Sequence, residues 1–469
     1  MVAEKYPMSK CEFISHKRLT QEIFKESIKY YCCLFDIKFK DLRPKKWFEN
    51  YISSSRCRNS HRGLLQLGVD KNNIEEVEKP KNGKKKVLKQ SNDIIDELNK
   101  MFDMKDIGLD KAVINNGRIV SARKIWTTIT EIDFKIIKLC YDFNPKISIR
   151  NFRRYNKAYL PTEFVSSILE LYKNKTTLKD VEGKEIEYGQ SKEMINSTYG
   201  MISTDIVRPV MKYDKLENEW KDPHIPNLLG AINKYNNDSG RFMFYPWGVW
   251  VTAYARYNLF RAIIECAGDY LYSDTDSVKY KNELRHIEFF NTYNIEIREK
   301  LIDAIEFHKK KSSGLTVSDI EPITIKGVKK CLGQWNFDGH YSQFKTIGAK
   351  RYLVQYSNDK RNKAKNRGKY EITVSGLDKR KAMPYMLDKY KEKVFCAFSN
   401  NLIIPAEYSG KVTHTYIDTE RKGMVTDYLG VSGNYYELSC IHLENSALSL
   451  KLSNDYLSYL LGIAFMEVD

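Results

Sequence analysis

Hydrophobic and polar residues follow two different periods along this chain. Residues 31–39 begin with an apolar run and end in strict alternation, which predicts a buried strand that becomes half-exposed. Alternating segments return over residues 341–356 and predict further strands. Residues 46–125 are polar and irregular. Residues 205–243 are rich in Asn, Asp, Pro and Gly, so we interpret them as an insertion or loop.

Apolar residues three or four positions apart predict helices elsewhere in the chain. The clearest stripe follows Pro161 and should pack against a core; its members are Phe164, Val165, Ile168, Leu169 and Tyr172. A basic turn at residues 173–179 is expected to follow this helix. The other expected helices cover residues 131–141, a segment from about 191, 247–266, 379–398 and 456–465.

An acidic turn is the most informative stretch. Residues 272–277 read Tyr-Ser-Asp-Thr-Asp-Ser, which places Asp274 and Asp276 two positions apart between apolar strand formers. This spacing fits a tight turn between two short strands. Two carboxylates at one place repel each other unless a cation lies between them, and Mg²⁺ prefers such oxygen ligands. The stretch therefore predicts a metal site for phosphoryl transfer, with an ordinary surface turn as the alternative.

Charge and aromatic content point to a polyanionic partner. The chain has 469 residues, a net charge of +17 and 32 Tyr. A basic surface attracts nucleic acid or an acidic membrane face, and aromatic rings stack on bases, so nucleic acid is favoured. The length suggests about three domains. Two basic stretches, residues 79–86 and 358–369, are interpreted as a hairpin tip and a charged connection.

Several classes of protein are disfavoured by what the sequence lacks. The nine Cys form no CxxC pair and the eight His form no metal-binding cluster, which argues against a disulfide scaffold or zinc module and for the reducing cytoplasm. No apolar run reaches the roughly 18 residues that span a bilayer. We therefore expect a cytoplasmic protein without a membrane partner, in the host cytoplasm if a phage encodes it.

A second group of polar residues recurs with the period of a helix. Lys192, Asn196 and Tyr199 would fall on one helical face. A cation, an amide and an aromatic ring together suit a nucleotide, because they match its triphosphate, sugar and base. A merely solvated polar face is the alternative.

Together these stretches resemble family B DNA polymerases. Residues 192–200 (Lys-x3-Asn-Ser-x-Tyr-Gly) resemble the fingers motif of that family, and residues 272–277 resemble its catalytic palm motif. Residues 350–352 (Lys-Arg-Tyr) are similar to its Lys-x-Tyr primer motif. Residues 246–256 and 332–335 resemble the protein-primed branch, which includes polymerases of small tailed phages and mobile elements.

The resemblance implies a role for each matching residue. Asp276 would bind the metal ions directly, with Asp274 in support; the cofactor would be two Mg²⁺ ions, with Mn²⁺ as the alternative. Lys192 would neutralise the incoming triphosphate, Asn196 would orient the sugar, and Tyr199 would pack against the nascent base pair. A second triphosphate contact is implied for Lys175. Contacts to primer–template DNA are implied for Lys350, Tyr352, Thr275 and Ser277.

The resemblance also implies an α+β fold with the right-hand architecture of a polymerase. A palm would be built on an antiparallel sheet, beside helical fingers and a thumb. The ranges are palm for 1–45 and 244–355, fingers for 151–203, thumb for 356–469, and insertions similar to terminal-protein regions 1 and 2 for 46–150 and 204–243.

One part of the family pattern is not found in this sequence. The first palm motif, Asp-x2-Ser-Leu/Ser-Tyr-Pro, does not occur, and neither does an exonuclease domain, whose Asp-x-Glu motif would precede that palm motif. Residues 1–10 resemble the segment directly after the first palm motif in the phage enzymes. We therefore expect an incomplete palm. The chain would be the C-terminal half of a split DNA-directed DNA polymerase that adds dNTPs to a primer 3′ end, with a truncated reading frame as the alternative.

Partners and rival functions can be derived from this interpretation. The expected partners are primer–template DNA, dNTPs, a separate N-terminal polymerase/exonuclease half that joins by strand addition, and a terminal protein. Without its N-terminal half the chain should be nearly inactive. The main rival is a non-catalytic DNA-binding or assembly protein derived from a polymerase. Reverse transcriptases and RNA polymerases also use paired Asp residues, but the motifs at 192–200 and 350–352 favour a DNA polymerase.

Overall fold

The computed structural model separates the chain into two compact units. It describes residues 1–48, 113–115, 118–203, 213–214, 219–220, 227–238, 244–311, 314–348, 350–416, 422–426, 432–436 and 441–451. Among the described residues, the first unit holds Met1–Trp47 and Ala122–Asn336, and the second holds Phe48, those of Lys111–Ser121 and those from Phe337 onward. The expected features at residues 79–86 and 456–465 lie outside the described residues.

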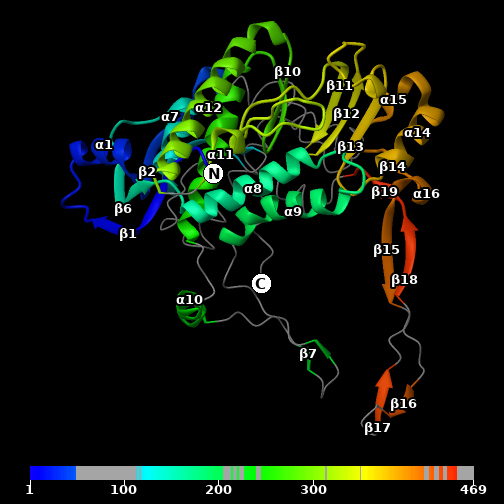
Figure 1. The fold of residues 1–469 in the computed structure, drawn as a ribbon, viewed down its shortest axis with the longest axis horizontal. Coiled ribbons are helices and arrows are strands. Elements are labelled where there is room, and N and C mark those ends of the chain that lie inside the picture. Colours follow the sequence, from blue (N-terminus) through cyan, green and yellow to red (C-terminus); the bar gives the residue numbers. More distant parts are fainter. Residues whose placement is uncertain are drawn as a thin grey trace, which may run out of the picture. The chain divides into compact units, whose positions relative to one another are not determined.

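An antiparallel sheet occupies the N-terminal part of the chain (Figure 1). Its strand order is β1-β6-β2-β4-β3, with the short β5 paired to β2. The bounds are β1 Tyr6–Ile14, β2 Cys32–Pro44, β3 Val113–Asn115, β4 Arg118–Thr130, β5 Tyr141–Asp142 and β6 Ser148–Ala158. The strand expected from residues 31–39 is confirmed as β2, at the centre of the sheet.

Aromatic side chains fill one face of this sheet. Phe35 of β2 and Phe152 of β6 stack at 5.4 Å between ring centroids. Phe24 of α1 (Gln21–Tyr30) meets Phe35 edge to face at 5.4 Å, and Phe134 of α7 (Glu131–Cys140) joins the same cluster. Such pairs add about 0.5–1.5 kcal/mol beyond area burial. They hold α1 and α7 against the sheet.

Four long helices complete the first unit. They are α8 (Thr162–Thr177), α9 (Glu185–Ile202), α11 (Tyr245–Glu265) and α12 (Ile287–Lys309). Their shared core contains Val165, Leu169, Trp250, Leu301 and Ile305, each at most 1% exposed. The helices expected near 131–141, after Pro161 and over 247–266 are therefore confirmed.

Some sequence-based boundaries are wrong. Residues 118–125, interpreted as irregular, belong to β4. Helix α8 continues through Thr177, so most of the expected basic turn at 173–179 is helical, and α9 begins at Glu185 instead of about 191. Within the expected loop at 205–243 the structure shows β7 (Tyr213–Asp214), β8 (Glu219–Trp220) and α10 (Leu228–Asn237).

The second unit is built on a three-stranded antiparallel sheet in the order β11-β12-β13. The strands are β11 (Tyr341–Gly348), β12 (Arg351–Tyr356) and β13 (Tyr370–Val374), which confirms strands at 341–356. The single helix expected at 379–398 is broken into α14 (Lys379–Tyr390) and α15 (Val394–Ala397). Lys391 lies between them at φ 45°, a left-handed conformation that an α-helix does not continue through.

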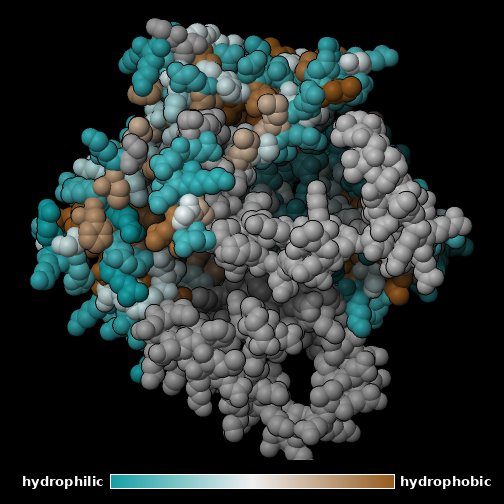
Figure 2. All heavy atoms as spheres, turned by 90° about the horizontal axis from the view of Figure 1, so that it is seen from below, coloured by the Kyte–Doolittle hydropathy of each residue, from teal (hydrophilic) through white to brown (hydrophobic). Residues whose placement is uncertain are grey.

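Short strand pairs occupy the chain toward the C-terminus (Figure 1). They are β14 (Ile403–Ile404) with β19 (Leu448–Ser449), β15 (Lys411–Tyr416) with β18 (Ile441–Ser446), and β16 (Lys422–Thr426) with β17 (Ser432–Tyr436). Helix α16 (Ala406–Ser409) lies between β14 and β15 in sequence. On the face drawn in Figure 2, hydrophilic side chains dominate the described surface and hydrophobic ones form small separate patches. Among the described residues, no helix is long and apolar enough to cross a bilayer.

Candidate active site

The acidic turn is the tip of a two-stranded hairpin. Strands β9 (Tyr270–Asp274) and β10 (Ser277–Tyr280) pair antiparallel, with Asp274 opposite Ser277. Only Thr275 and Asp276 lie in the loop. Asp276 is exposed and Asp274 is partly exposed, so both carboxylates of the predicted turn are at the hairpin end and accessible to solvent. The predicted strand–turn–strand geometry is confirmed.

The backbone of this tip is strained at Thr275. Its φ is +50°, a left-handed conformation that is an outlier for a β-branched residue and costs roughly 1–2 kcal/mol. The Thr275 hydroxyl donates a hydrogen bond to Asp274 Oδ1 at 3.0 Å. The Ser277 hydroxyl donates to the carbonyl oxygen of Asp274 at 3.1 Å. A turn that served only to reverse the chain would favour Gly or Asn here, whereas Thr275 orients a carboxylate.

The opposite end of the hairpin is fastened by a cluster of charged and polar groups. His286 contacts Glu265 at 3.1 Å through Nδ1 and Asp269 at 3.1 Å through Nε2. Asn282 donates to Asp269 at 2.7 Å, and the Lys281 amide donates to the Asp269 carbonyl at 2.9 Å. Burial works to raise the pKa of Asp269, but hydrogen bonds from His286 and Asn282 and the nearby Arg285 outweigh it and lower that pKa.

A buried carboxylate holds the helix that leads into the hairpin. Glu131, at the start of α7, is 1% exposed and accepts hydrogen bonds from the Trp250 indole at 3.1 and 3.2 Å. It also accepts the amide N–H of Cys33 at 2.9 Å, and Lys157 lies 3.7 Å away. Trp250 belongs to α11, Cys33 to β2 and Lys157 to β6. Glu131 therefore ties α11 to the sheet at one point.

Burial and the neighbouring donors have opposite effects on the pKa of the Glu131 carboxyl group. Loss of solvent raises the pKa of Glu131, opposed by the Cys33 amide, Lys157 and the Trp250 indole. All of these neighbours can donate a hydrogen bond or carry positive charge, so they favour the ionised form. This role could not be read from the sequence, because a Glu in the first turn of a helix is ordinarily a solvated partner of the helix dipole.

A close approach between helices joins α11 to α9. A Cβ added at Gly248 of α11 would lie 2.2 Å from Ser203 Oγ and 3.2 Å from Ile202 Cγ2. Glycine suits this spacing, because any side chain here would force the Ser203 hydroxyl to move and would crowd Ile202. Helix α9 also packs against α8, and α11 contacts β10. The helix with the predicted nucleotide-binding face is thus connected through α11 to the acidic hairpin.

The predicted face of α9 exists as expected. Lys192, Asn196 and Tyr199 are all exposed, Tyr199 by 39%. Ser191, Thr198 and Ile202 are buried instead and form the face that packs. Lys175 lies in the last turn of α8 and is partly exposed. Contact of any of these side chains with a nucleotide stays a prediction.

The predicted primer-binding residues belong to the second unit. Lys350 lies in the connection between β11 and β12, is exposed, and has φ +53°. Tyr352 of β12 stacks on Phe344 of β11 with 5.8 Å between ring centroids. Lys350 and Tyr352 therefore occupy one hairpin, and their role at a primer terminus stays a prediction.

The hairpin tip fits part of a magnesium site. Asp274 and Asp276 supply carboxylate oxygens of the kind Mg²⁺ prefers, and one of them is oriented by a hydroxyl. Within the described ranges no cluster of three or more His, Cys, Asp or Glu could hold a metal ion. The tip alone thus supplies fewer ligands than a two-ion clamp requires.

Comparison with solved structures finds phi29 DNA polymerase at low similarity. A ternary complex of that enzyme with primer–template DNA and incoming nucleotide gives a TM-score of 0.48 at 13% identity over 96% of this chain. An orthorhombic crystal form gives 0.44 at 14% over 96%, and a binary complex with primer–template DNA gives 0.43 at 14% over 93%.

The matches cover only part of the phi29 polymerase chains. This chain spans 55–56% of the length of those phi29 polymerase chains. No family model and no curated protein matches its sequence. Similarity at this level does not by itself establish a shared fold or activity, so the chemistry of this chain has to be argued from its own residues.

Proposed function

We propose that this chain is the C-terminal part of a DNA-directed DNA polymerase of the protein-primed family B type. The observation that carries the proposal is the acidic tip: two accessible carboxylates flank a strained Thr275 that donates a hydrogen bond to Asp274. Backbone strain of about 1–3 kcal/mol persists where the surrounding structure and a function maintain it. A surface turn needs neither the strain nor the paired charges.

The residues of this chain would act by binding and orienting. Asp276 and Asp274 would hold magnesium at the hairpin tip, where the metal would stabilise the charge of the transferred phosphoryl group. Lys192 would bind the triphosphate of an incoming dNTP, with Lys175 as a second cation, while Asn196 and Tyr199 would position its sugar and base. Primer–template contacts would come from Thr275 and Ser277 at the tip.

The remaining primer contacts and the domain assignment are part of the same proposal. Lys350 and Tyr352 would hold the primer terminus. The palm would comprise 1–45 and 244–355, the fingers 151–203 and the thumb 356–469. Residues 122–130 pair with β2 in the sheet, so this part of the proposed first insertion, 46–150, is continuous with the proposed palm.

In this proposal a third carboxylate would come from another polypeptide. Two Asp residues on one turn cannot enclose two ions that lie about 3.5–4 Å apart, and the first palm motif does not occur here. A separate N-terminal half would provide it. Within the part of the chain that the structure describes, the hairpin β9–β10 pairs with no further strand. Two strands are marginal on their own, so a strand from that half would also stabilise the tip.

Reconstitution tests this proposal. The chain alone and the chain mixed with a segment that carries the first palm motif are compared in primer extension with Mg²⁺ and dNTPs. We expect little or no extension alone and at least ~10³-fold more with the segment, because completing a metal clamp changes rates by orders of magnitude. DNA binding without extension in either case would instead support the non-catalytic assembly protein.

A further inference from the structure

The connection between β12 and β13 carries an unusual concentration of positive charge. Residues 358–369, here called the basic loop, read Asn-Asp-Lys-Arg-Asn-Lys-Ala-Lys-Asn-Arg-Gly-Lys. The loop contains six cationic side chains and one carboxylate. Its net charge is +5, compared with +17 for the entire chain. Connections of this kind are usually solvated and have no fixed conformation, so the internal contacts of the loop decide whether it is a surface of defined shape.

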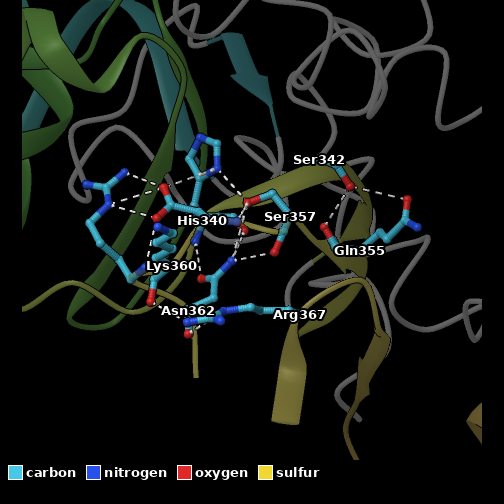
Figure 3. A network of polar contacts seen from close by, with 9 residues as sticks. His340, Ser342, Gln355, Ser357, Lys360, Asn362 and Arg367 are labelled. Carbon is cyan, nitrogen blue, oxygen red and sulfur yellow. Dashed lines mark hydrogen bonds and ion pairs between the residues drawn. The ribbon is translucent and has the colours of Figure 1, made fainter. Parts of the chain in front are cut away.

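A buried asparagine fixes the conformation of the basic loop (Figure 3). Asn362 is 3% exposed. Its Oδ1 accepts the amide N–H of His340 at 2.9 Å, and its Nδ2 donates to the carbonyl oxygens of His340 and Ser357, both at 2.9 Å. Buried polar side chains that satisfy several backbone groups specify one arrangement of the chain. The middle of the loop is therefore held at the open end of the β11–β12 hairpin, by the residue before β11 and the residue after β12.

The two arginines of the loop are used for its own structure. Arg367 donates to the carbonyl oxygens of Lys360 at 2.6 Å and Asn362 at 3.2 Å. Arg361 pairs with Asp359 at 2.8 Å and lies 4.8 Å from the ring centroid of Phe337. The single carboxylate of the loop is thus occupied by Arg361.

The four lysines are not used in this way. Lys360, Lys363, Lys365 and Lys369 are exposed, and no carboxylate within the described residues forms an ion pair with any of them. Four ammonium groups on one rigid loop repel each other, which costs stability. A flexible loop could relieve that repulsion by spreading, but the Asn362 clamp prevents it.

A hollow beside the loop extends the same surface. It has a volume of about 270 Å³. Its polar and aromatic lining comes from Asn366 and Lys369 of the loop, Lys379 and Arg380 of α14, Tyr356, Tyr370 and the acidic Glu371, and its apolar lining from Ile372 and Met383. Arg380 is among the exposed residues, and Lys379 pairs with Glu371. Arg380 lies 3.5 Å from Asp378, so both cations that α14 contributes to the hollow have a carboxylate partner and, among the described residues, the unpaired positive charge of this surface lies on the loop lysines.

We propose that the basic loop and this hollow bind the phosphate backbone of a nucleic-acid duplex. A phosphate chain supplies the counter-charges that the four lysines lack within the described residues, and neutralising them relieves the repulsion built into the loop. The tyrosine rings of the hollow pack on other rings, Tyr356 with Tyr341 at 5.0 Å and Tyr370 with Phe395 at 6.0 Å. Stacking on unpaired bases is the usual mode for single strands, so a duplex backbone suits this surface better.

This binding does not depend on the proposed catalysis. Every residue that carries it belongs to the second unit, whereas the acidic tip belongs to the first. If the reconstituted pair does not extend a primer but the chain binds duplex as predicted here, the proposed function alone is refuted. If the pair extends a primer but replacing the loop lysines leaves duplex binding unchanged, the basic loop alone is refuted.

The test is the salt dependence of duplex binding by the full chain. The variant Lys360→Gln/Lys363→Gln/Lys365→Gln is compared with wild type on a blunt DNA duplex of arbitrary sequence, by fluorescence anisotropy over a range of KCl concentrations. Each phosphate contact contributes about −0.9 to the slope of log K against log salt. We expect the slope to become shallower by about 2–3 and the affinity at low salt to fall by at least about tenfold.

A matched control removes the same charge from another basic cluster. Lys309, Lys310 and Lys311 are exposed at the end of α12 in the first unit, and their triple Gln substitution should leave the slope nearly unchanged. Equal effects of the two triple variants would overturn the proposal, because diffuse charge would then explain binding. A larger loss of affinity for single-stranded DNA than for the duplex would also overturn it. The same measurement with an RNA duplex shows which duplex form binds more tightly.

A second variant tests the rigid shape of the loop without changing its charge. Asn362→Ala removes the three hydrogen bonds of the clamp and keeps every lysine. If the ordered loop is the binding surface, affinity at low salt falls by about threefold to tenfold. Thermal melting shows whether the unit stays folded, and a folded variant with unchanged affinity would contradict the proposal.

Discussion

Glu131 offers the sharpest test of how the helix behind the acidic hairpin is held. Its carboxylate accepts from the Cys33 amide and the Trp250 indole and lies 3.7 Å from Lys157. Glu131→Ala leaves both donors buried without an acceptor, at about 1–3 kcal/mol each, and leaves the Lys157 charge without its partner. Breaking a buried pair from one side costs about 3–5 kcal/mol in total. We expect a loss of that size in the free energy of unfolding.

Glu131→Gln separates the hydrogen bonds from the charge. One amide oxygen placed at Oε2 still accepts from Cys33 and Trp250, which lie 2.9 and 3.1 Å from that atom. The amide nitrogen would then face Lys157, so the variant should lose only about 1–2 kcal/mol. Urea unfolding monitored by tryptophan fluorescence measures both variants. A loss below about 1 kcal/mol for Glu131→Ala, with an unchanged m-value, would refute this account.

The same residue predicts a dependence on pH. Because burial raises the pKa of Glu131 above its ordinary value of 4.5, the unfolded chain releases this proton first as the pH rises. The stability that comes from this raised pKa is therefore fully present below about pH 4.5. It declines as the pH rises and is lost once the pH has passed the raised pKa. Glu131→Gln cannot release a proton and should lack this decline. Identical pH profiles for the two proteins would contradict the assignment.

Three further changes test the supports of the candidate site. Gly248→Ala should lower stability by about 1–3 kcal/mol through the clash with Ser203 Oγ, whereas in a Ser203→Ala background it should cost less than about 1 kcal/mol, as thermal melting of the double variant can show. Asp269→Asn should cost about 1–2 kcal/mol in stability. Because the pKa of Asp269 is lowered, the stability that its carboxylate contributes is present above about pH 3.8 and is lost as the pH falls through the lowered pKa. The Asn variant should not show this loss in acid unfolding. Thr275→Gly should relieve the left-handed strain and raise stability by about 1 kcal/mol. It should also lower primer extension by the reconstituted pair, because Asp274 loses its hydroxyl partner. A rise in both stability and primer extension would contradict a functional tip.

Local patterns along the chain predicted much of the first unit. Strand β2 alternates between buried and half-exposed positions from Phe35 to Phe39, so its period was visible. The acidic hairpin was predicted because its turn residues and charges lie within six positions of each other. Both elements are determined by neighbours in sequence.

Strand β4 was missed because its period changes along its length. Its buried positions are Ala122, Ile125, Ile129 and Thr130, which do not share one alternation. Its pairing with β2 keeps one register, from Leu34 opposite Thr130 to Leu42 opposite Ala122. That partner strand is distant in the sequence, so the local pattern of β4 alone does not reveal the pairing.

The supports of the site were also outside the reach of local patterns. Glu131 contacts Trp250 across 119 positions, and Gly248 meets Ser203 from another helix. Helix α8 continues to Thr177 through polar residues because Thr176 is 8% exposed and packs inward. Each of these features depends on which elements meet in the fold, while the chemistry at the hairpin tip depends on adjacent residues.

The most direct measurement of the central claim is the rate of primer extension by the reconstituted pair when Asp276 is replaced by Asn. The side chain keeps its size and its exposed position at the hairpin tip, so DNA affinity should change less than about twofold. If the acidic tip holds the catalytic metal, the rate falls by at least ~10³-fold. Extension at the wild-type rate by a folded Asp276→Asn protein would contradict a catalytic role for this hairpin.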